Sequence, residues 1–428
     1  MFSATARPEP SRRSCWAVSA LSRASLVRVC LLASLFSAAC ADVWGFHDLT
    51  GTDAGVTADG GGSSSGSGSG SGSSSGSDSG SGDGPAVQCD GGLTACGVTC
   101  VNSQGSDAKN CGACGHDCQG GACQQGACQP VVIASAQLYD AGSSLSGPTY
   151  LALDATDVYW VDPGFGVVLK CPKNGCNNSP TTLASGQMPA GLAVDGVNVY
   201  WSSAGTVMKV PVGGGTPTTF LTTPYGFVVG AVDAISLYGV GQADTDAGVV
   251  YTVGACAVGG CGSSPTVLAW SSPSESVGGL AIGPTALFWT TVSGPGGAVL
   301  KCAIAGCGGQ PTVLASAQPG PYHLALDSVS AYWTTADGTV VKVSIGGGPT
   351  TTLADGQSPT GGIAVDGANV YWTNVSGDGS IRRCAVGGCN NQPTSVAIGL
   401  SKPFAVAVDP TAVYWTDYGA GAVTKVAK

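Results

Sequence analysis

Side chains that could act as an acid, a base or a nucleophile are scarce in this sequence. The 428 residues include three histidines, and only His323 lies beyond residue 128. Glu275 is the only glutamate after residue 39. Nucleophilic hydrolysis needs a base held beside the nucleophile, most often a histidine. A catalytic triad would have to use His323, and no pattern marks a nucleophile for it, so the sequence indicates no catalytic residues.

Aspartate is the remaining carboxylate, and it recurs at one position directly before a turn. The copies are Asp154, Asp195, Asp327, Asp366 and Asp409. A residue that returns with each unit of a fold, and whose side chain bonds turn N–H groups, is typical of a turn cap. Carboxylates also bind calcium. We therefore predict no metal and no cofactor, and keep an oxygen-rich metal site as the alternative.

Cysteine occurs 19 times, in ordered blocks. Eight copies lie close together: Cys89, Cys96, Cys100, Cys111, Cys114, Cys118, Cys123 and Cys128. Eight more form Cys-x4-Cys pairs: Cys171/Cys176, Cys256/Cys261, Cys302/Cys307 and Cys384/Cys389. Cys111 and Cys114, with His116 or Cys118, could bind zinc through thiolate and imidazole groups. The even number in each block favours disulfides instead, as expected in an oxidising compartment.

The first 39 residues are predicted to be an export signal. Arginines end at Arg28, an apolar run covers residues 29–37, and small residues precede Cys40. The run is too short for a membrane span, which needs about 20 residues. The ending Ala38-Ala39-Cys40 resembles a bacterial lipoprotein signal, which implies lipidation of Cys40. Because Ser37 stands where an aliphatic residue is usual, cleavage after Ala41 and secretion stay the alternative.

Two segments without a hydrophobic core follow the signal. Residues 40–87 are rich in alternating Gly and Ser, which cannot bury apolar surface, so we predict a disordered tether. Residues 88–128 have few large apolar side chains and need crosslinks to hold a structure. Their Cys111-Gly-Ala-Cys114-Gly run resembles small modules of predicted myxobacterial surface proteins, which implies an export context and no activity.

An aromatic pair recurs through the rest of the chain. Its seven copies are Tyr159-Trp160, Tyr200-Trp201, Tyr238-Gly239, Phe288-Trp289, Tyr332-Trp333, Tyr371-Trp372 and Tyr414-Trp415. Each unit places an apolar strand before the pair, and a third strand and a Pro-Thr strand after it. Four short strands per period of about 40 to 45 residues indicate a β-propeller blade. Residues 129–428 of this all-β chain are therefore predicted to form seven blades, with six or eight less favoured.

The units resemble the YWTD family of propellers. Tyr414-Trp415-Thr416-Asp417 matches the tetrapeptide fully, and Tyr371-Trp372-Thr373-Asn374 matches three of its four positions. The resemblance covers residues 129–428. Members of the family usually have six blades, whereas seven units are present here.

The ends of the propeller sequence predict how the ring closes. The last unit stops at Lys428, after its third strand, while residues 129–137 nearly duplicate residues 310–318, an outer strand. We expect the earlier segment to complete the last blade, so that no edge stays exposed.

Two further recurring features have structural interpretations. The aromatic pairs are predicted to be core. The basic residue of the third strand recurs in six units and is predicted to lie on a solvated blade face: Lys170, Lys209, Lys301, Lys342, Arg383 and Lys425.

The charge of the chain limits its partners. The whole sequence has 16 Lys plus Arg and 26 Asp plus Glu. Five Arg and Glu9 belong to the first 39 residues, which leaves 11 basic (16 − 5) and 25 acidic (26 − 1) residues and a net charge of −14. A nucleic-acid binder should be basic. We therefore predict no nucleic-acid partner, and a membrane partner only through the lipid anchor.

The loops that lead into the first strand of each blade should gather at one face of the propeller. The large side chains in these loops differ from blade to blade. They are Tyr150, Met188, Tyr225, Trp270, Tyr322, His323 and Phe404. Aromatic residues on a rigid scaffold are typical of recognition sites, although local loop packing is the alternative. We predict a monomeric, lipid-anchored envelope protein, in the outer membrane, whose propeller binds or scaffolds an unknown protein or glycan. The alternatives are a lactonase-like hydrolase or lyase using the central channel, and a structural surface protein.

Overall fold

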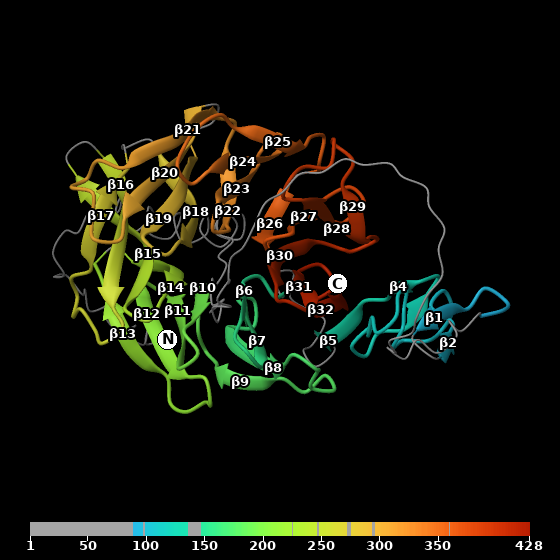
Figure 1. The fold of residues 1–428 in the computed structure, drawn as a ribbon. Helices are drawn as coiled ribbons and strands as arrows, with labels where there is room; N and C mark the ends of the chain where they lie inside the picture. The colour runs from blue at the N-terminus through green and yellow to red at the C-terminus, as the bar shows by residue number, and fades with distance from the viewer. Residues whose placement is uncertain are drawn as a thin grey trace, which may run out of the picture. The chain divides into compact units, whose positions relative to one another are not determined.

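A ring of seven four-stranded antiparallel sheets makes up residues 131–428 (Figure 1). The structure is a computed structural model, and it describes residues 89–96, 99–135, 147–224, 226–245, 248–271, 275–292, 296–358 and 360–428. The predicted export signal, Cys40, the predicted tether and Tyr225 lie outside these residues. Among the described residues there is no helix, and so none that is long and apolar enough to cross a membrane.

The first strand of each blade is innermost, and the strands then run outward in chain order. Blades 1 to 3 are β6 (Leu151–Leu153), β7 (Asp157–Asp162), β8 (Val167–Pro172) and β9 (Thr181–Ala184); β10 (Pro189–Val194), β11 (Asn198–Ser203), β12 (Thr206–Pro211) and β13 (Thr218–Thr222); and β14 (Phe227–Val232), β15 (Ser236–Thr245), β16 (Gly248–Ala257) and β17 (Thr266–Trp270). Blades 4 to 6 are β18 (Ser276–Ile282), β19 (Ala286–Val292), β20 (Gly297–Ala303) and β21 (Thr312–Gln318); β22 (Pro321–Leu326), β23 (Ser330–Thr335), β24 (Val340–Ser344) and β25 (Thr351–Ala354); and β26 (Thr360–Val365), β27 (Asn369–Asn374), β28 (Ser380–Ala385) and β29 (Thr394–Ala397).

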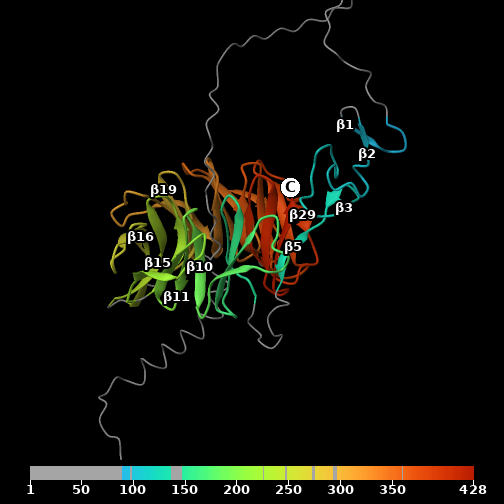
Figure 2. The same ribbon diagram turned by 90° about the horizontal axis from the view of Figure 1, so that it is seen from below.

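Blade 7 joins the two ends of the propeller, as predicted. It contains β30 (Pro403–Val408), β31 (Ala412–Asp417), β32 (Ala422–Ala427) and the early strand β5 (Val131–Ser135). β5 pairs antiparallel with β32, and Figure 2 shows it beside the C-terminal blade. Ile133 of β5 is buried in the same core cluster as Trp160 of blade 1. The prediction of seven blades, with the early strand completing the last one, is therefore confirmed.

The aromatic pairs lie between blades as core. Trp201, Trp333 and Trp415 are fully buried, as are most of the tyrosines beside them. A hydroxyl after the tryptophan ties each of three blades to the next: Thr290 to the Tyr322 carbonyl (2.9 Å), Thr373 to the Phe404 carbonyl (3.0 Å) and Thr416 to the Thr149 carbonyl (3.0 Å). The last of these bonds joins blade 7 to blade 1, across the point of closure.

The basic residues of the third strands do not form a solvated face, so that prediction is wrong. Three of them cross to the turn of the next blade, where Nζ donates to a carbonyl oxygen: Lys301 to Ile345 (2.9 Å), Lys342 to Val386 (2.5 Å) and Lys425 to Lys173 (2.8 Å). Lys425 is buried. A long side chain can pack its apolar stem along a blade and still satisfy its ammonium group at the next one.

The recurring aspartates cap the turn after each first strand, as predicted. Asp195 Oδ1 accepts the N–H groups of Val197 and Asn198, and its Oδ2 accepts the hydroxyl of Tyr200 at 3.0 Å. The same Asp–Tyr pair recurs at Asp154/Tyr159, Asp233/Tyr238, Asp327/Tyr332, Asp366/Tyr371 and Asp409/Tyr414. Burial, and then the neighbouring carboxylate, raises the pKa of Tyr371 to about 12.

Blade 4 lacks both members of this pair, because Gly283 and Phe288 occupy the two positions. The carboxylate and hydroxyl have disappeared together, as expected when a buried polar group would otherwise lose its partner. The pair is therefore a structural unit of the blade.

Disulfides connect all the cysteines of the described residues. The turns of blades 1, 3, 4 and 6 hold Cys171–Cys176, Cys256–Cys261, Cys302–Cys307 and Cys384–Cys389. The cysteine-rich module contains β1 (Thr94–Cys96), β2 (Thr99–Val101), β3 (Cys123–Gln124) and β4 (Ala127–Cys128). Its bridges are Cys89–Cys100, Cys96–Cys114, Cys111–Cys123 and Cys118–Cys128, a connectivity that the sequence left open.

The closure of the ring by β5 can be tested with two neighbouring residues of this strand. Ile133 is 2% exposed and Val132 is 57% exposed. We expect Ile133→Ala to lower the free energy of unfolding by about 2 to 4 kcal/mol, because it leaves a cavity at the closure. Val132→Ala should change it by less than about 0.5 kcal/mol. Denaturant unfolding without reductant measures both, and equal effects would contradict a latch packed through Ile133.

The Asp–Tyr pair can be tested by restoring it in blade 4. We expect Phe288→Tyr alone to destabilise the protein, because its hydroxyl would lack a carboxylate. Gly283→Asp with Phe288→Tyr should recover stability, with a coupling of about 0.5 to 1.5 kcal/mol in a double-mutant cycle. Gly283 has no positive φ that would oppose the substitution. Additive effects of the two substitutions would show that the pair is not a unit.

Candidate functional site

Three of the predicted ligand-face residues meet at the centre of the ring. Tyr150, His323 and Phe404 lie on or beside the first strands of blades 1, 5 and 7, and all three are buried. The Phe404 ring lies edge-on to Tyr150 and to His323, with centroids 6.4 and 6.3 Å apart. In blade 6, a Cβ at Gly362 would lie 2.9 Å from the Val406 nitrogen, so glycine is required for this close approach. The cluster is packing and not an exposed recognition surface.

The remaining predicted residues do not join this cluster. Trp270 is 52% exposed and ends β17, the outermost strand of blade 3. Met188 is also exposed, in the loop before β10. Tyr322 is half-buried, and its carbonyl accepts the Thr290 hydroxyl. The structure therefore separates the large loop residues into a buried group and scattered exposed positions.

His323 is sealed within the centre. It is 2% exposed, and its Nδ1 has no hydrogen-bond partner among the described residues. Burial lowers its pKa to about 4, so the imidazole is neutral near pH 7. A general base must reach the proton it removes, and a ring enclosed in this way cannot meet a substrate without movement of the cluster.

A cavity of about 1390 Å³ occupies the end of the channel where the first strands finish. We call this end the Asp face. Small side chains at one repeated position line it: Ala152, Ala281, Ala325, Ala364 and Ala407. The lining also contains charged side chains of blades 1, 2, 6 and 7: Asp154, Lys173, Asp195, Asp366, Asp409 and Lys428.

Two lysines neutralise part of the charge at the rim of this cavity. Lys173 Nζ lies 3.0 Å from Asp409 of blade 7, and Lys428 Nζ lies 2.6 Å from Asp366 of blade 6. Although burial opposes it, N–H and hydroxyl bonds from Thr411 and the ammonium of Lys173 lower the pKa of Asp409 to about 2. Sequence reasoning missed these ion pairs. The available signal was that Lys stands at the position after the third strand in blades 1 and 7, where blades 2 to 6 have Val or Ile.

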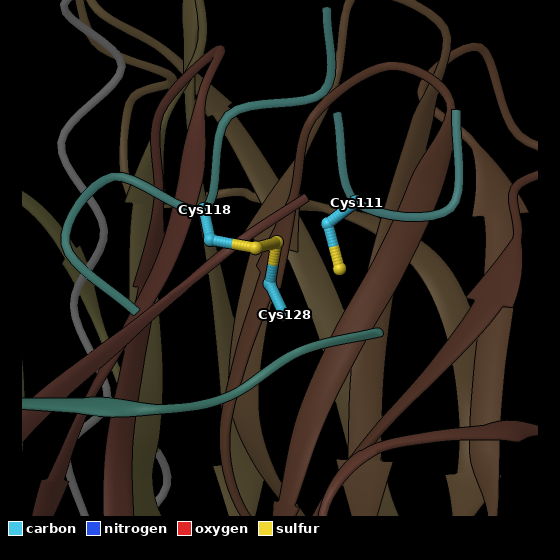
Figure 3. Close-up of side chains that lie close together, drawn as sticks. All are labelled: Cys111, Cys118 and Cys128. Carbon is cyan, nitrogen blue, oxygen red and sulfur yellow. A yellow bond between two sulfur atoms is a disulfide. The ribbon is translucent and has the colours of Figure 1, made fainter. Parts of the chain in front are cut away.

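The predicted metal alternatives find little support in the described part of the chain. The rim carboxylates are each committed to turn N–H groups and to a tyrosine. The one close group of three or more potential ligands in the described segments is Cys111, Cys118 and Cys128. Figure 3 shows Cys118 and Cys128 joined, and Cys111 pairs with Cys123. Sulfurs held in disulfides are not the thiolates that zinc requires.

A second cavity, of about 330 Å³, lies at blade 6. Arg382 lines it and donates to Ser380, Ser395 and Asp378. Because this guanidinium is already paired within its own blade, the cavity offers no evident anion site.

Comparisons with known proteins are consistent with the fold. No protein-family model and no curated protein matches the sequence. Among solved structures, a virginiamycin B lyase from Staphylococcus aureus has a TM-score of 0.54 at 12% identity, covering 70% of this chain and 98% of that one. A streptogramin B lyase has a TM-score of 0.53 at 12% identity, with the same coverage. The WD40 propeller domain of Doa1 has a TM-score of 0.52 at 11% identity, covering 70% and 97%. At these identities the chain is similar to them in fold alone.

Proposed function

We propose that this protein is an exported, lipid-anchored envelope protein whose propeller is a binding or scaffolding module. The observation that carries the binding role is the contrast between the two ends of the channel. One end is filled by buried Tyr150, His323 and Phe404, while the Asp face opens into a cavity with charged groups at its rim. A rigid ring with one open, chemically varied end presents a preformed binding surface.

Polar groups elsewhere in the propeller support binding over catalysis. The repeated aspartates cap turns, and three of the repeated lysines join neighbouring blades. The single propeller histidine is enclosed. These groups stabilise the fold and leave no base beside an accessible nucleophile among the described residues.

The anchor is supported by the sequence around Cys40 and by the composition that follows it. Sixteen cysteines, from Cys89 to Cys389, form eight disulfides, which suits an oxidising compartment. A Gly/Ser tether would hold the module and propeller clear of a lipid surface. We propose the outer membrane as its location and an unknown protein or glycan as its partner.

Mass spectrometry of the protein from a bacterial membrane fraction, without reductant, tests the anchor. We expect the mature N-terminal peptide to begin at Cys40 and to carry diacyl or triacyl modification. Cys40→Ser should move the protein to the soluble fraction. A wild-type protein that begins at Asp42 and is soluble would refute the anchor while leaving the binding role intact.

A lyase using the central channel is the second candidate, because two of the similar solved structures are named as lyases. It requires His323 to act as an acid or base. A buried, neutral imidazole could not act in this way. The two possibilities differ in how the free energy of unfolding depends on pH.

The pH dependence of stability tests the state of His323. The native pKa of about 4 lies below the ordinary 6.5, so the unfolded chain binds more protons between these values. Stability is then full above about pH 6.5 and falls as the pH drops toward 4, by about 2 kcal/mol between pH 7 and 5. We expect His323→Leu to abolish this part of the pH dependence.

Tyr150→Leu is the matched control, since it disturbs the same cluster without removing a group that titrates in this range. It should keep the wild-type slope. Equal slopes for wild type and His323→Leu would show that the imidazole is accessible and would favour the lyase.

A further inference from the structure

Two turns meet on each blade at the Asp face. The residue after the third strand donates its N–H to the carbonyl of the turn between the first two strands. Blades 2, 3 and 5 show this at Val212 to Val197 (2.9 Å), Val258 to Ile235 (2.9 Å) and Ile345 to Val329 (2.9 Å). The same bond joins Lys173 to Thr156 in blade 1 and Lys428 to Thr411 in blade 7. Each blade therefore presents a pair of adjacent side chains at this face.

These pairs divide the face into two parts. Blades 7 and 1 present threonine with lysine, whereas blades 2, 3 and 5 present two aliphatic residues each. The pairs of the two remaining blades are Thr285 with Ile304 in blade 4 and Ala368 with Val386 in blade 6. Val197 is 66% exposed, Ile235 71% and Val329 63%, and their partners are half-buried. In blade 4 only Ile304 belongs to the series, because its partner at the turn is Thr285. We call this surface the apolar arc: Val197, Val212, Ile235, Val258, Ile304, Val329 and Ile345.

Carboxylates without ion pairs adjoin the apolar arc. Asp195, Asp233 and Asp327 begin the same turns, and no lysine or arginine pairs with them in the described residues, in contrast to Asp366 and Asp409. The arc thus combines exposed aliphatic side chains with uncompensated negative charge.

We propose that the apolar arc docks a partner protein through a segment bearing basic and apolar side chains. The inference rests on the proposed binding role and names its surface and its partner chemistry. Exposed aliphatic side chains on blades 2, 3 and 5 gain by burial, and the carboxylates favour a cationic partner. A second copy of this chain, with a net charge of −14 over residues 40–428, would bring like charges together, as would an anionic lipid surface.

Peptide display tests this proposal. The oxidised mature protein is used to select phage-displayed random dodecapeptides, and the selected peptides are then compared on wild type and on the triple variant Val197→Asn, Ile235→Asn, Val329→Asn. We expect the selected peptides to combine Lys or Arg with Leu, Ile or Phe. A synthetic copy of the best peptide should bind the triple variant at least about tenfold more weakly than wild type. Its affinity should also fall several-fold between about 0.05 and 0.5 M NaCl.

A matched control triple lies on the outer parts of blades 4, 6 and 7. Val313, Ile398 and Val132 are 56%, 66% and 57% exposed. Changing them to Asn should leave peptide affinity within about twofold of wild type. If the arc triple fails to fold, Ile235→Asn alone should still weaken binding.

Three outcomes would overturn the proposal. Acidic or neutral selected peptides would contradict the partner chemistry. Peptides that bind wild type and arc triple equally would show a binding module that uses another surface, which leaves the proposed function standing. Sedimentation showing a dimer that the arc triple abolishes would identify a second copy as the occupant.

Discussion

Pairing of β5 with β32 is the interaction on which the rest of the structure depends. Each blade buries its aromatic pair against the next blade, so no blade has a complete core alone. The ring is stable only if its first and last members also meet. Three contacts lie at that junction: the β5–β32 ladder, the Thr416–Thr149 bond and the packing of Ile133 with Trp160. Because the early strand completes the last blade, closure leaves no unpaired edge there.

Repeated polar residues are structural in this propeller because repetition gives each of them the same buried environment. The Asp–Tyr pair shows this directly, since Gly283 and Phe288 replace both members in one blade. Function is therefore expected where the repetition fails. Lys173 and Lys428 replace aliphatic residues at one position and neutralise Asp409 and Asp366. One side of the Asp face is therefore ion-paired, while the other combines exposed aliphatic side chains with unpaired carboxylates. Asymmetry of this kind lets a ring of similar blades favour one partner.

The closed end of the channel also limits function. Tyr150, His323 and Phe404 come from three blades and fill the centre as packing. A propeller enzyme working through this end would need those rings to move. The Asp face instead holds a cavity of about 1390 Å³, lined by alanines of the first strands and also by Lys109 and Gln119 of the cysteine-rich module.

The sequence by itself determined the propeller class, and it predicted seven blades, the outer strand of blade 7, the turn-cap role of Asp195 and the hairpin disulfides. Each of these follows from the period of the repeat, or from pairs of residues that are both present or both absent in a given repeat. Only the tertiary structure decided where the side chains of different blades meet. It showed that Lys301 and Lys342 reach the next blade instead of solvent, that His323 is enclosed by Phe404, and that Val197 and Val212 adjoin. The residues of different blades come close only because the blades pack against one another around the ring. The repeat pattern in the sequence does not show which long side chain crosses from one blade to the next.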